Sequence, residues 1–249
     1  MYFDPRGGSN RYGVKPDFFR QWSPEMAYVL GFLYADGCIV DAKSSRAQYI
    51  EFSSKDIDVL EKIKSALGSK HPIHFYPPRK ITHRNGKVYE NAGLFRLRIG
   101  SRRMYADLEE ISLTPHKSKT ITFPKDLSTG HLGNFIRGYF DGDGSIVFNK
   151  KKWIRVVFTS ASKRFLEQLS ERLSAAIAIR QRPVRLGHDS YCLDYFTQEG
   201  LKVLNFIYRN ANLDGLYLDR KYKFYKNISP KYSYILGKSI GQLKINSAY

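Results

Sequence analysis

Two stretches of this chain decide its fold: SPEMAYVLGFLYADG (23–37) and HLGNFIRGYFDGDG (131–144). Each is an apolar segment of helical length that carries small residues four positions apart and ends in Asp-Gly. The small residues are Gly31 and Ala35 in the first stretch and Gly138 and Gly142 in the second. Since residues four apart lie on one face of a helix, we expect two helices with a stripe free of bulk, on which another backbone can come close.

Residues at the ends of these stretches support helices of this length. Ser23 is a good helix cap, with Pro24 at the first helical position and Glu25 in the first turn. Gly37 and Gly144 follow the last apolar residues. We expect each of these two glycines to be the left-handed residue that closes its helix.

The segments after the two stretches also match, in the same order. The first copy predicts strands near 38–41 and 47–53, a helix over 54–67 that Gly68 ends, strands near 72–82 and 94–100, and a helix over 102–111. The second copy predicts strands over 145–148 and 152–160, a helix from Ser162, strands near 180–187 and 190–197, and a helix over 198–209. Asn85-Gly86 predicts a hairpin turn in the first copy. The chain therefore uses one helix-strand-strand-helix-strand-strand-helix unit twice.

This duplication predicts an α+β fold of two tandem αββαββα repeats. We expect the two helices of the quoted stretches to pack together at the interface, about a pseudo-twofold axis, beneath a saddle of antiparallel sheets. The repeats are predicted at 23–127 and 128–228, with an N-terminal extension over 1–22 and a C-terminal tail over 229–249. This packing brings Asp36 and Asp143 together at one end of the helix pair.

The charge of the chain favours a polyanionic partner. Among 249 residues, 41 Lys and Arg oppose 23 Asp and Glu, which leaves a net charge of +18. Such a charge costs self-repulsion in the compact state unless a polyanion neutralises it, so nucleic acid is the leading partner. A membrane surface is a weaker alternative, because the basic residues are dispersed.

With no apolar run of about 18–20 residues, we expect a soluble, intracellular protein. The two cysteines, Cys38 and Cys192, are too few for a disulfide framework or a zinc site.

Basic side chains alternate with apolar ones along the predicted strands. Arg96 and Arg98 alternate with Phe95, Leu97 and Ile99, so one sheet face packs on helices and the other carries arginines. Any one of these arginines could serve solubility alone, but as a set they indicate a basic saddle. The residues predicted to bind nucleic acid are Arg46, Lys80, Arg84, Lys87, Arg96, Arg98, Lys152, Arg155, Arg182 and Arg185.

The two aspartates that close the apolar stretches need a positive partner. The last turn of a helix carries partial negative charge, so Asp36 and Asp143 repel both the helix ends and each other. A divalent metal is the natural counterion, because hard cations take carboxylate and carbonyl oxygens. Paired ions could also activate a water against a phosphodiester. A single Asp-Gly is most often only a turn, but two in phase favour a site.

VLGFLYADG (29–37) and IRGYFDGDG (136–144) resemble the two motifs of a single-chain LAGLIDADG homing endonuclease. The resemblance implies a monomer that binds a long asymmetric duplex DNA site. It implies cleavage of both strands across the minor groove with Mg²⁺, leaving 3′ overhangs and 5′-phosphate ends.

The resemblance also implies roles for individual residues. The second acidic position of each motif, Asp36 and Asp143, would bind metal, with the backbone carbonyls of Ala35 and Gly142. A lysine near the end of each repeat would assist catalysis, and we favour Lys117 over Lys119 in the first repeat and Lys221 in the second. The first motif departs from the family pattern with Tyr34 at its first acidic position. The matching residue of the second motif, Asp141, is expected to be structural.

Four alternatives remain for the function. A generic basic RNA-binding protein does not explain the duplicated Asp-Gly. An intron RNA maturase would use the same scaffold and make intron RNA a further partner. A nuclease-inactive DNA-binding regulator would have lost cleavage, although such proteins tend to lose the metal carboxylates that this chain keeps. A domain excised from an intein is weakly supported, because no Cys or Ser opens the chain and no His-Asn pair closes it.

Overall fold

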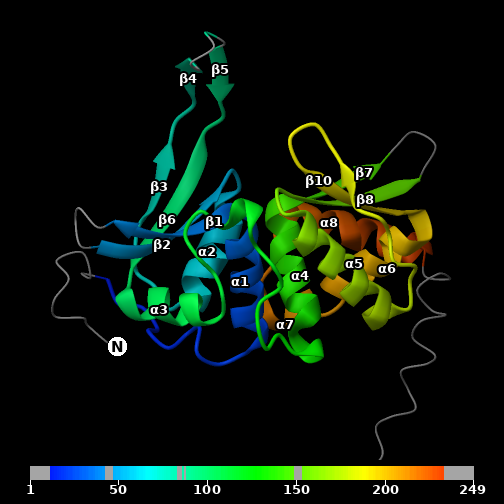
Figure 1. Cartoon of the computed structure of the whole chain (residues 1–249), viewed down its shortest axis with the longest axis horizontal. Helices are drawn as coiled ribbons and strands as arrows, with labels where there is room; N and C mark the ends of the chain where they lie inside the picture. Colours follow the sequence, from blue (N-terminus) through cyan, green and yellow to red (C-terminus); the bar gives the residue numbers. More distant parts are fainter. Residues whose placement is uncertain (1–11, 43–46, 83–85, 87, 149–152, 233–249) are drawn as a thin grey trace, which may run out of the picture.

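The computed structural model describes residues 12–42, 47–82, 86, 88–148 and 153–232. Two helices lie side by side at its centre, α1 (Pro24–Asp36) and α4 (Thr129–Asp143), as Figure 1 shows. The Ser23 hydroxyl accepts a hydrogen bond from the amide of Met26 at 3.1 Å, so Ser23 caps α1 as predicted. The two helices divide the molecule into halves.

Each half carries one antiparallel four-stranded sheet, and the two sheets have the same strand order under the repeat. The first sheet runs β1 (Gly37–Ala42), β2 (Ala47–Ser54), β6 (Leu94–Gly100), β3 (Ile73–Tyr76). The second runs β7 (Gly144–Phe148), β8 (Ile154–Ser160), β10 (Tyr191–Phe196), β9 (Arg185–Leu186). Gly37 pairs with Phe52 and Gly144 pairs with Phe158. The duplicated α+β architecture is therefore confirmed, with matching register.

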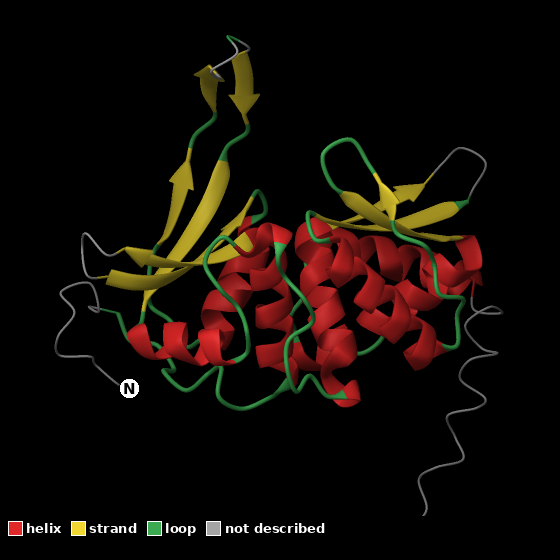
Figure 2. Cartoon of the chain, in the orientation of Figure 1, coloured by secondary structure: helices red, strands yellow, loops and turns green. Residues whose placement is uncertain are grey.

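A layer of helices lies beneath both sheets, and the other face of each sheet stays open (Figure 2). The helices besides α1 and α4 are α2 (Ile57–Ala66), α3 (Arg102–Glu110), α5 (Lys163–Ile177), α6 (Thr197–Tyr208), the short α7 (Ala211–Asp214) and α8 (Asp219–Ile228). Short 3-10 turns form at Lys117–Lys119 and Ser229–Tyr232. Ile50, Phe52 and Leu97 are buried against this layer, while the residues between them face away from it.

The first half carries a long two-stranded arm that the second half lacks among its described residues. The strand predicted near 72–82 is interrupted at Pro77 and Pro78, which supply no backbone N–H to a ladder. The chain continues as β4 (Arg79–Thr82), which pairs with β5 (Val88–Asn91), and this hairpin projects beyond the sheet in Figure 1. Gly86, in the predicted turn, has a positive φ of 77°.

The strand predicted near 180–187 was wrong for most of its length, since only Arg185–Leu186 is a strand. Backbone groups that the ladder would need are bonded to side chains instead. The amide of Arg182 donates to the Ser170 hydroxyl at 2.8 Å, and the amide of Arg180 donates to the Glu199 carboxylate at 3.3 Å. Pro183, which has no amide N–H, adds to this interruption.

The prediction that Gly37 and Gly144 are left-handed helix caps was also wrong. Both are extended, with φ of −125° and −89°, and each begins a strand directly after its helix. Glycine is required by close approach instead. A Cβ on Gly37 would lie 2.4 Å from the Leu33 side chain, and one on Gly144 would lie 2.1 Å from the Phe140 ring. Gly68, which was predicted to end the helix over 54–67, does have a positive φ, at 58°.

Two further sequence predictions can be set against this fold. The helix expected over 54–67 begins at Ile57, because Ser54 still belongs to β2. The repeat boundaries at 23–127 and 128–228 stay a prediction. Within the described residues, every helix is too short or too polar to cross a membrane.

Candidate functional site

The helices α1 and α4 touch through their backbones. A Cβ on Gly31 would lie 2.0 Å from the Phe135 carbonyl oxygen, and one on Gly138 would lie 2.0 Å from the Tyr28 carbonyl oxygen. Farther along, a Cβ on Gly142 would lie 2.5 Å from that of Ala35. The four small residues of the stripes thus lie at the helix contact, as their spacing predicts.

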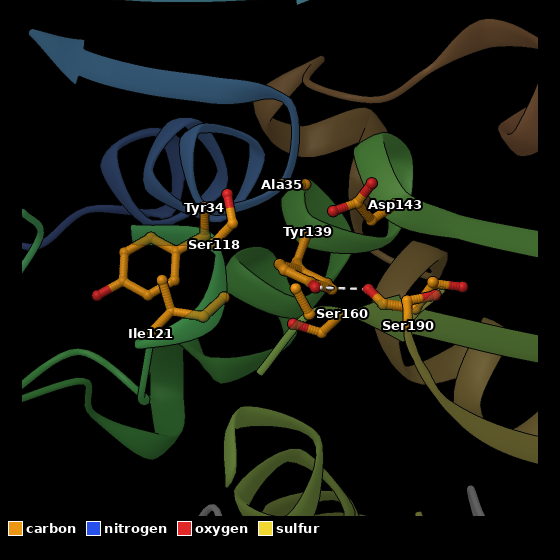
Figure 3. A pocket seen from close by; sticks show the side chains of 10 residues that line it. Tyr34, Ala35, Ser118, Ile121, Tyr139, Asp143, Ser160 and Ser190 are labelled. Carbon is orange, nitrogen blue, oxygen red and sulfur yellow. Dashed lines mark hydrogen bonds between the residues drawn. The ribbon is translucent and has the colours of Figure 1, made fainter. Parts of the chain in front are cut away.

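This contact brings the two aspartates together at the sheet side of the helix pair. A Cβ added at Gly142 would lie 3.4 Å from a carboxylate oxygen of Asp36. Figure 3 shows Asp143 beside Ala35, the residue before Asp36. Burial, followed by the negative charge of Asp36, raises the pKa of Asp143 to about 6. Burial also raises the pKa of Asp36, against the lowering effect of Lys221 and Lys117. The two carboxylates therefore repel each other in a partly buried site.

The two predicted lysines contact equivalent backbone carbonyls in the two halves, those of Gly37 and Gly144. The ammonium of Lys117 donates to the Gly37 carbonyl at 2.7 Å. The ammonium of Lys221 donates to the Gly144 carbonyl at 2.6 Å, to that of Asp141 at 2.9 Å and to that of Phe140. Both side chains are buried, with exposed fractions of 6% and 4%. Each lysine thus holds the carbonyl of the glycine that follows an aspartate.

The lysines act across the interface as well as within their own halves. The largest charge effect that lowers the pKa of Asp36 comes from Lys221, and the largest that lowers the pKa of Asp143 comes from Lys117. Burial lowers the pKa of both lysines, that of Lys221 to about 8. The four groups form one electrostatic unit to which both halves contribute.

The first acidic positions of the motifs differ between the halves. Asp141 is buried and accepts hydrogen bonds from the Tyr28 hydroxyl at 2.8 Å, the Leu218 amide at 2.9 Å and the Tyr208 hydroxyl. All these contacts are internal, so the expected structural role is supported. Tyr34, at the equivalent position, lies with its ring 5.2 Å from that of Phe135. Packing of an aromatic ring replaces a buried carboxylate there.

A pocket of about 190 Å³ opens beside Asp143 on the side of the second sheet. Figure 3 shows its lining side chains, which come from both halves and are rich in hydroxyl groups. The Tyr139 hydroxyl at its floor donates to the Thr159 carbonyl at 2.6 Å. The lining residues are Tyr34, Ala35, Ser118, Ile121, Tyr139, Asp143, Thr159, Ser160, Ala161 and Ser190. Water or a small polar group can therefore reach Asp143 from this side.

The donor set fits a hard divalent cation only in part. Asp36 and Asp143 supply oxygen ligands, and a cation would offset both the burial and the mutual repulsion that raise the pKa of Asp143. Among the described residues, no group of three or more His, Cys, Asp or Glu side chains forms a complete site. Backbone carbonyls, water or substrate oxygens would have to supply the remaining ligands. The chemistry of the donors is that of Mg²⁺ or Ca²⁺ rather than of zinc.

Four predicted DNA-binding arginines lie on the open sheet faces: Arg96, Arg98, Arg155 and Arg185. Lys80 is exposed on the arm. Arg182 lies apart from them, since it pairs with Glu199 of α6 at 2.6 Å, so the helix layer holds it. Arg46, Arg84, Lys87 and Lys152 lie outside the described residues.

Two carboxylates on the open faces were missed by the sequence reasoning. Glu51 pairs with Arg98 at 2.6 Å and with Arg96 at 3.1 Å. Asp194 pairs with Arg155 at 2.7 Å and also with Arg185. The signal was present, because Glu51 alternates with Ile50 and Phe52, which face the helices. Burial would raise the pKa of Asp194, but hydrogen bonds from Arg185 and Arg155 lower it overall.

Comparisons with known proteins point to one family. The family described as LAGLIDADG-like domain matches residues 23–111 and 131–206. No curated protein matches the chain in sequence. Among solved structures, the homing endonuclease I-WcaI bound to its DNA recognition sequence is 15% identical, with a TM-score of 0.53 over 80% of this chain and 86% of that one.

Two further solved structures are similar. The LAGLIDADG meganuclease I-CpaMI bound to uncleaved DNA is 12% identical, with a TM-score of 0.50 over 90% of this chain and 97% of that one. I-SmaMI bound to an uncleaved DNA target in the presence of calcium ions is 11% identical, with a TM-score of 0.51 over 90% and 97%. At these identities the likeness establishes a shared fold.

Proposed function

This chain belongs to the family of LAGLIDADG-like domains, and we propose that it is a site-specific double-strand DNA endonuclease of the homing endonuclease type. The observation that carries the proposal is the pairing of Asp36 and Asp143 at the ends of two helices that touch through their backbones. The site lies between two sheets whose open faces point the same way (Figure 2). A duplex lying across both sheets would place its backbone over the aspartates.

Asp36 and Asp143, with the carbonyls of Ala35 and Gly142, would hold divalent cations, and we propose Mg²⁺ as the physiological ion. Such a cation, when bound, activates a water and offsets the charge that develops on the scissile phosphate. The repulsion between the two carboxylates keeps them receptive to a cation. The hydroxyl-lined pocket beside Asp143 gives water a path to the site.

The two lysines differ in what their ammonium groups can still do. Lys221 has three carbonyl acceptors, which match its three N–H donors. We therefore assign it a positioning role, in which it fixes the last turn of α4 under Asp143. Within the described part of the chain the Lys117 ammonium donates to one acceptor, the Gly37 carbonyl, and we propose that its other donors serve a water or a phosphate oxygen. Lys117 is thus the better candidate for direct participation in catalysis.

The substrate is proposed to be a long, asymmetric DNA duplex. The solved relatives I-WcaI, I-CpaMI and I-SmaMI are bound to DNA, and the net charge of +18 suits a polyanion. One chain supplies both halves of the site, so it acts as a monomer. Cleavage across the minor groove, with 3′ overhangs and 5′-phosphate ends, completes the proposal, which implies an intracellular place of action.

A nuclease-inactive DNA-binding regulator is the second candidate. Both carboxylates are present and face one common site, which favours the nuclease. Within the described residues we find no feature that prefers intron RNA over duplex DNA, so a maturase activity stays a prediction.

The proposal is tested by incubating the purified chain with a randomised duplex library and Mg²⁺, then sequencing the cut ends. We expect a single recovered site with staggered 3′ overhangs, and no cutting with EDTA. Recovery of bound duplexes that are never cut, with any divalent ion, would assign the chain to the regulator class instead.

A further inference from the structure

One carboxylate organises two arginines on the open face of the first sheet. Glu51 of β2 accepts a hydrogen bond from the Nε of Arg98 at 2.8 Å, and the Nη2 of Arg98 lies 2.6 Å from the same oxygen. Its other oxygen lies 3.1 Å from the Nε of Arg96. The arginines come from β6, the neighbouring strand, where Arg98 is directly opposite Glu51. One carboxylate thus hydrogen-bonds the guanidinium of Arg98 and forms an ion pair with that of Arg96, whose Nε has no hydrogen-bond partner among the described residues.

The second sheet has the same arrangement built from different strands. Asp194 of β10 accepts hydrogen bonds from the Nε of Arg155 at 2.7 Å and from Arg185, whose Nη2 lies 3.4 Å from the same carboxylate. Arg155 comes from β8 and Arg185 from β9. The side-chain exposed fractions also match. The carboxylates are 12% and 9% exposed, and their arginines are 29% and 49% in one sheet and 29% and 47% in the other.

Aromatic rings hold three of these arginines from a second direction. The guanidinium carbon of Arg96 lies 4.5 Å from the centre of the Tyr76 ring, and that of Arg98 lies 4.4 Å from the Tyr49 ring. Arg155 lies 5.9 Å from the Phe196 ring. A carboxylate on one edge and a ring on one face fix the orientation of the guanidinium plane. The guanidinium of a solvated arginine has no such fixed orientation.

A carboxylate on a surface that receives DNA needs an explanation. Each one removes positive charge where phosphates approach, so it weakens sequence-independent binding. The chain nevertheless keeps Glu51 and Asp194 nearly buried among the arginines of the open faces. The carboxylates provide orientation. Arg98 uses its Nε and Nη2 on Glu51, so the other donors of its five-donor fork stay directed at a fixed angle.

We propose that Glu51 and Asp194 are positioning residues that set base specificity, each aiming its arginine pair at guanine in one half of the recognised site. Arginine makes two parallel hydrogen bonds to the O6 and N7 of guanine in the major groove, and this geometry requires a fixed guanidinium plane. The inference rests on the proposed function, because it needs a DNA site. It adds which residues read that site and how they are held.

The test uses Glu51→Gln and Asp194→Asn, which keep the size of each side chain and remove its charge. Sites bound by each full-length variant are selected from a randomised duplex library with calcium in place of Mg²⁺, then sequenced. Affinity for an unrelated duplex is measured in parallel. Glu167→Gln is the control, since Glu167 carries the same charge on α5 and pairs there with Lys163 at 3.3 Å.

Each variant is expected to lose preference at a G·C pair by about tenfold, Glu51→Gln in one half of the site and Asp194→Asn in the other. Affinity for unrelated duplex is expected to stay equal or to rise, because one negative charge is gone, whereas a misfolded variant would lose affinity for every duplex. Glu167→Gln should keep the wild-type site.

Unchanged preference in both variants, or loss in the same half of the site, would overturn the inference while leaving an endonuclease intact. A wild-type chain that selects no site would instead remove the proposed function.

Discussion

Replacing Gly138 by Ala tests the contact that creates the site. The new Cβ would lie 2.0 Å from the Tyr28 carbonyl oxygen and 2.8 Å from the Phe32 amide nitrogen. Since these are backbone atoms of α1, no side-chain rotation can relieve the clash. The helices must separate by roughly 1 Å, and a gap of that size forfeits a quarter to a half of the dispersion energy across the contact.

The magnitude depends on two opposing effects. Overpacking of this kind costs about 1–3 kcal/mol and sometimes more, while Ala gains about 1 kcal/mol over Gly in helix propensity. Because the obstructing atoms are rigid, we expect a net loss of about 2 kcal/mol. For a chain of this length that corresponds to a fall of about 4–8 °C in thermal midpoint. Cleavage should fall by about 100-fold, because a displacement of 1 Å misplaces reacting groups.

The assay pairs thermal denaturation with cleavage of the selected duplex. Gly130→Ala is the matched control, since it is the same change on the same helix. The nearest atom to its Cβ would be the Ser128 hydroxyl oxygen at 3.8 Å, an ordinary contact distance. The control should leave the midpoint unchanged or raise it by up to about 4 °C, because it gains helix propensity without a clash. Equal behaviour of the two variants would refute the close backbone contact.

Three further outcomes are expected. Burial and then Asp36 raise the pKa of Asp143 to about 6, so Asp143 ionises as the pH rises through that value. The metal-free protein should then lose stability, and its affinity for calcium should rise. Thermal midpoints with and without calcium measure both effects. Asp214→Ala should lower the free energy of unfolding by denaturant by about 3–5 kcal/mol, because the buried charge of Arg137 loses its carboxylate partner. Lys221→Met should lower the thermal midpoint more than Lys117→Met, since it deprives three carbonyls of a donor rather than one.

The sequence was sufficient for the duplicated architecture because the evidence for it is local. The Gly31–Ala35 and Gly138–Gly142 stripes, the Asp-Gly endings and the alternation in the strands each occupy a few consecutive residues. Their repetition in phase predicts that the two halves match, and the sheets do match, since Gly37 pairs with Phe52 and Gly144 with Phe158. The meeting of Asp36 and Asp143 is a consequence of the packing of the stripes.

The sequence could not supply features that depend on neighbours distant in the chain. The edge strand β9 of the second sheet is short because the amides of Arg182 and Arg180 donate hydrogen bonds to the side chains of Ser170 and Glu199. Glu51 looks like an ordinary exposed residue until the register sets it opposite Arg98.

The two glycines after the helices show a second limit. Glycine at a helix end indicates a left-handed conformation, because that is its common local reason. The actual reason here is the space that Leu33 and Phe140 occupy. A glycine after a helix can be required by a left-handed φ or by a lack of room for a Cβ, and the sequence alone does not distinguish the two. The backbone angles distinguish them.

The most direct test of the paired carboxylates is cleavage of the selected duplex by Asp36→Asn and Asp143→Asn, followed strand by strand on labelled DNA. Binding of the same duplex is measured alongside. Each variant should lose double-strand cleavage while binding with near wild-type affinity, since one amide replaces one carboxylate without a change of shape. Retained double-strand cleavage by either variant would contradict the account.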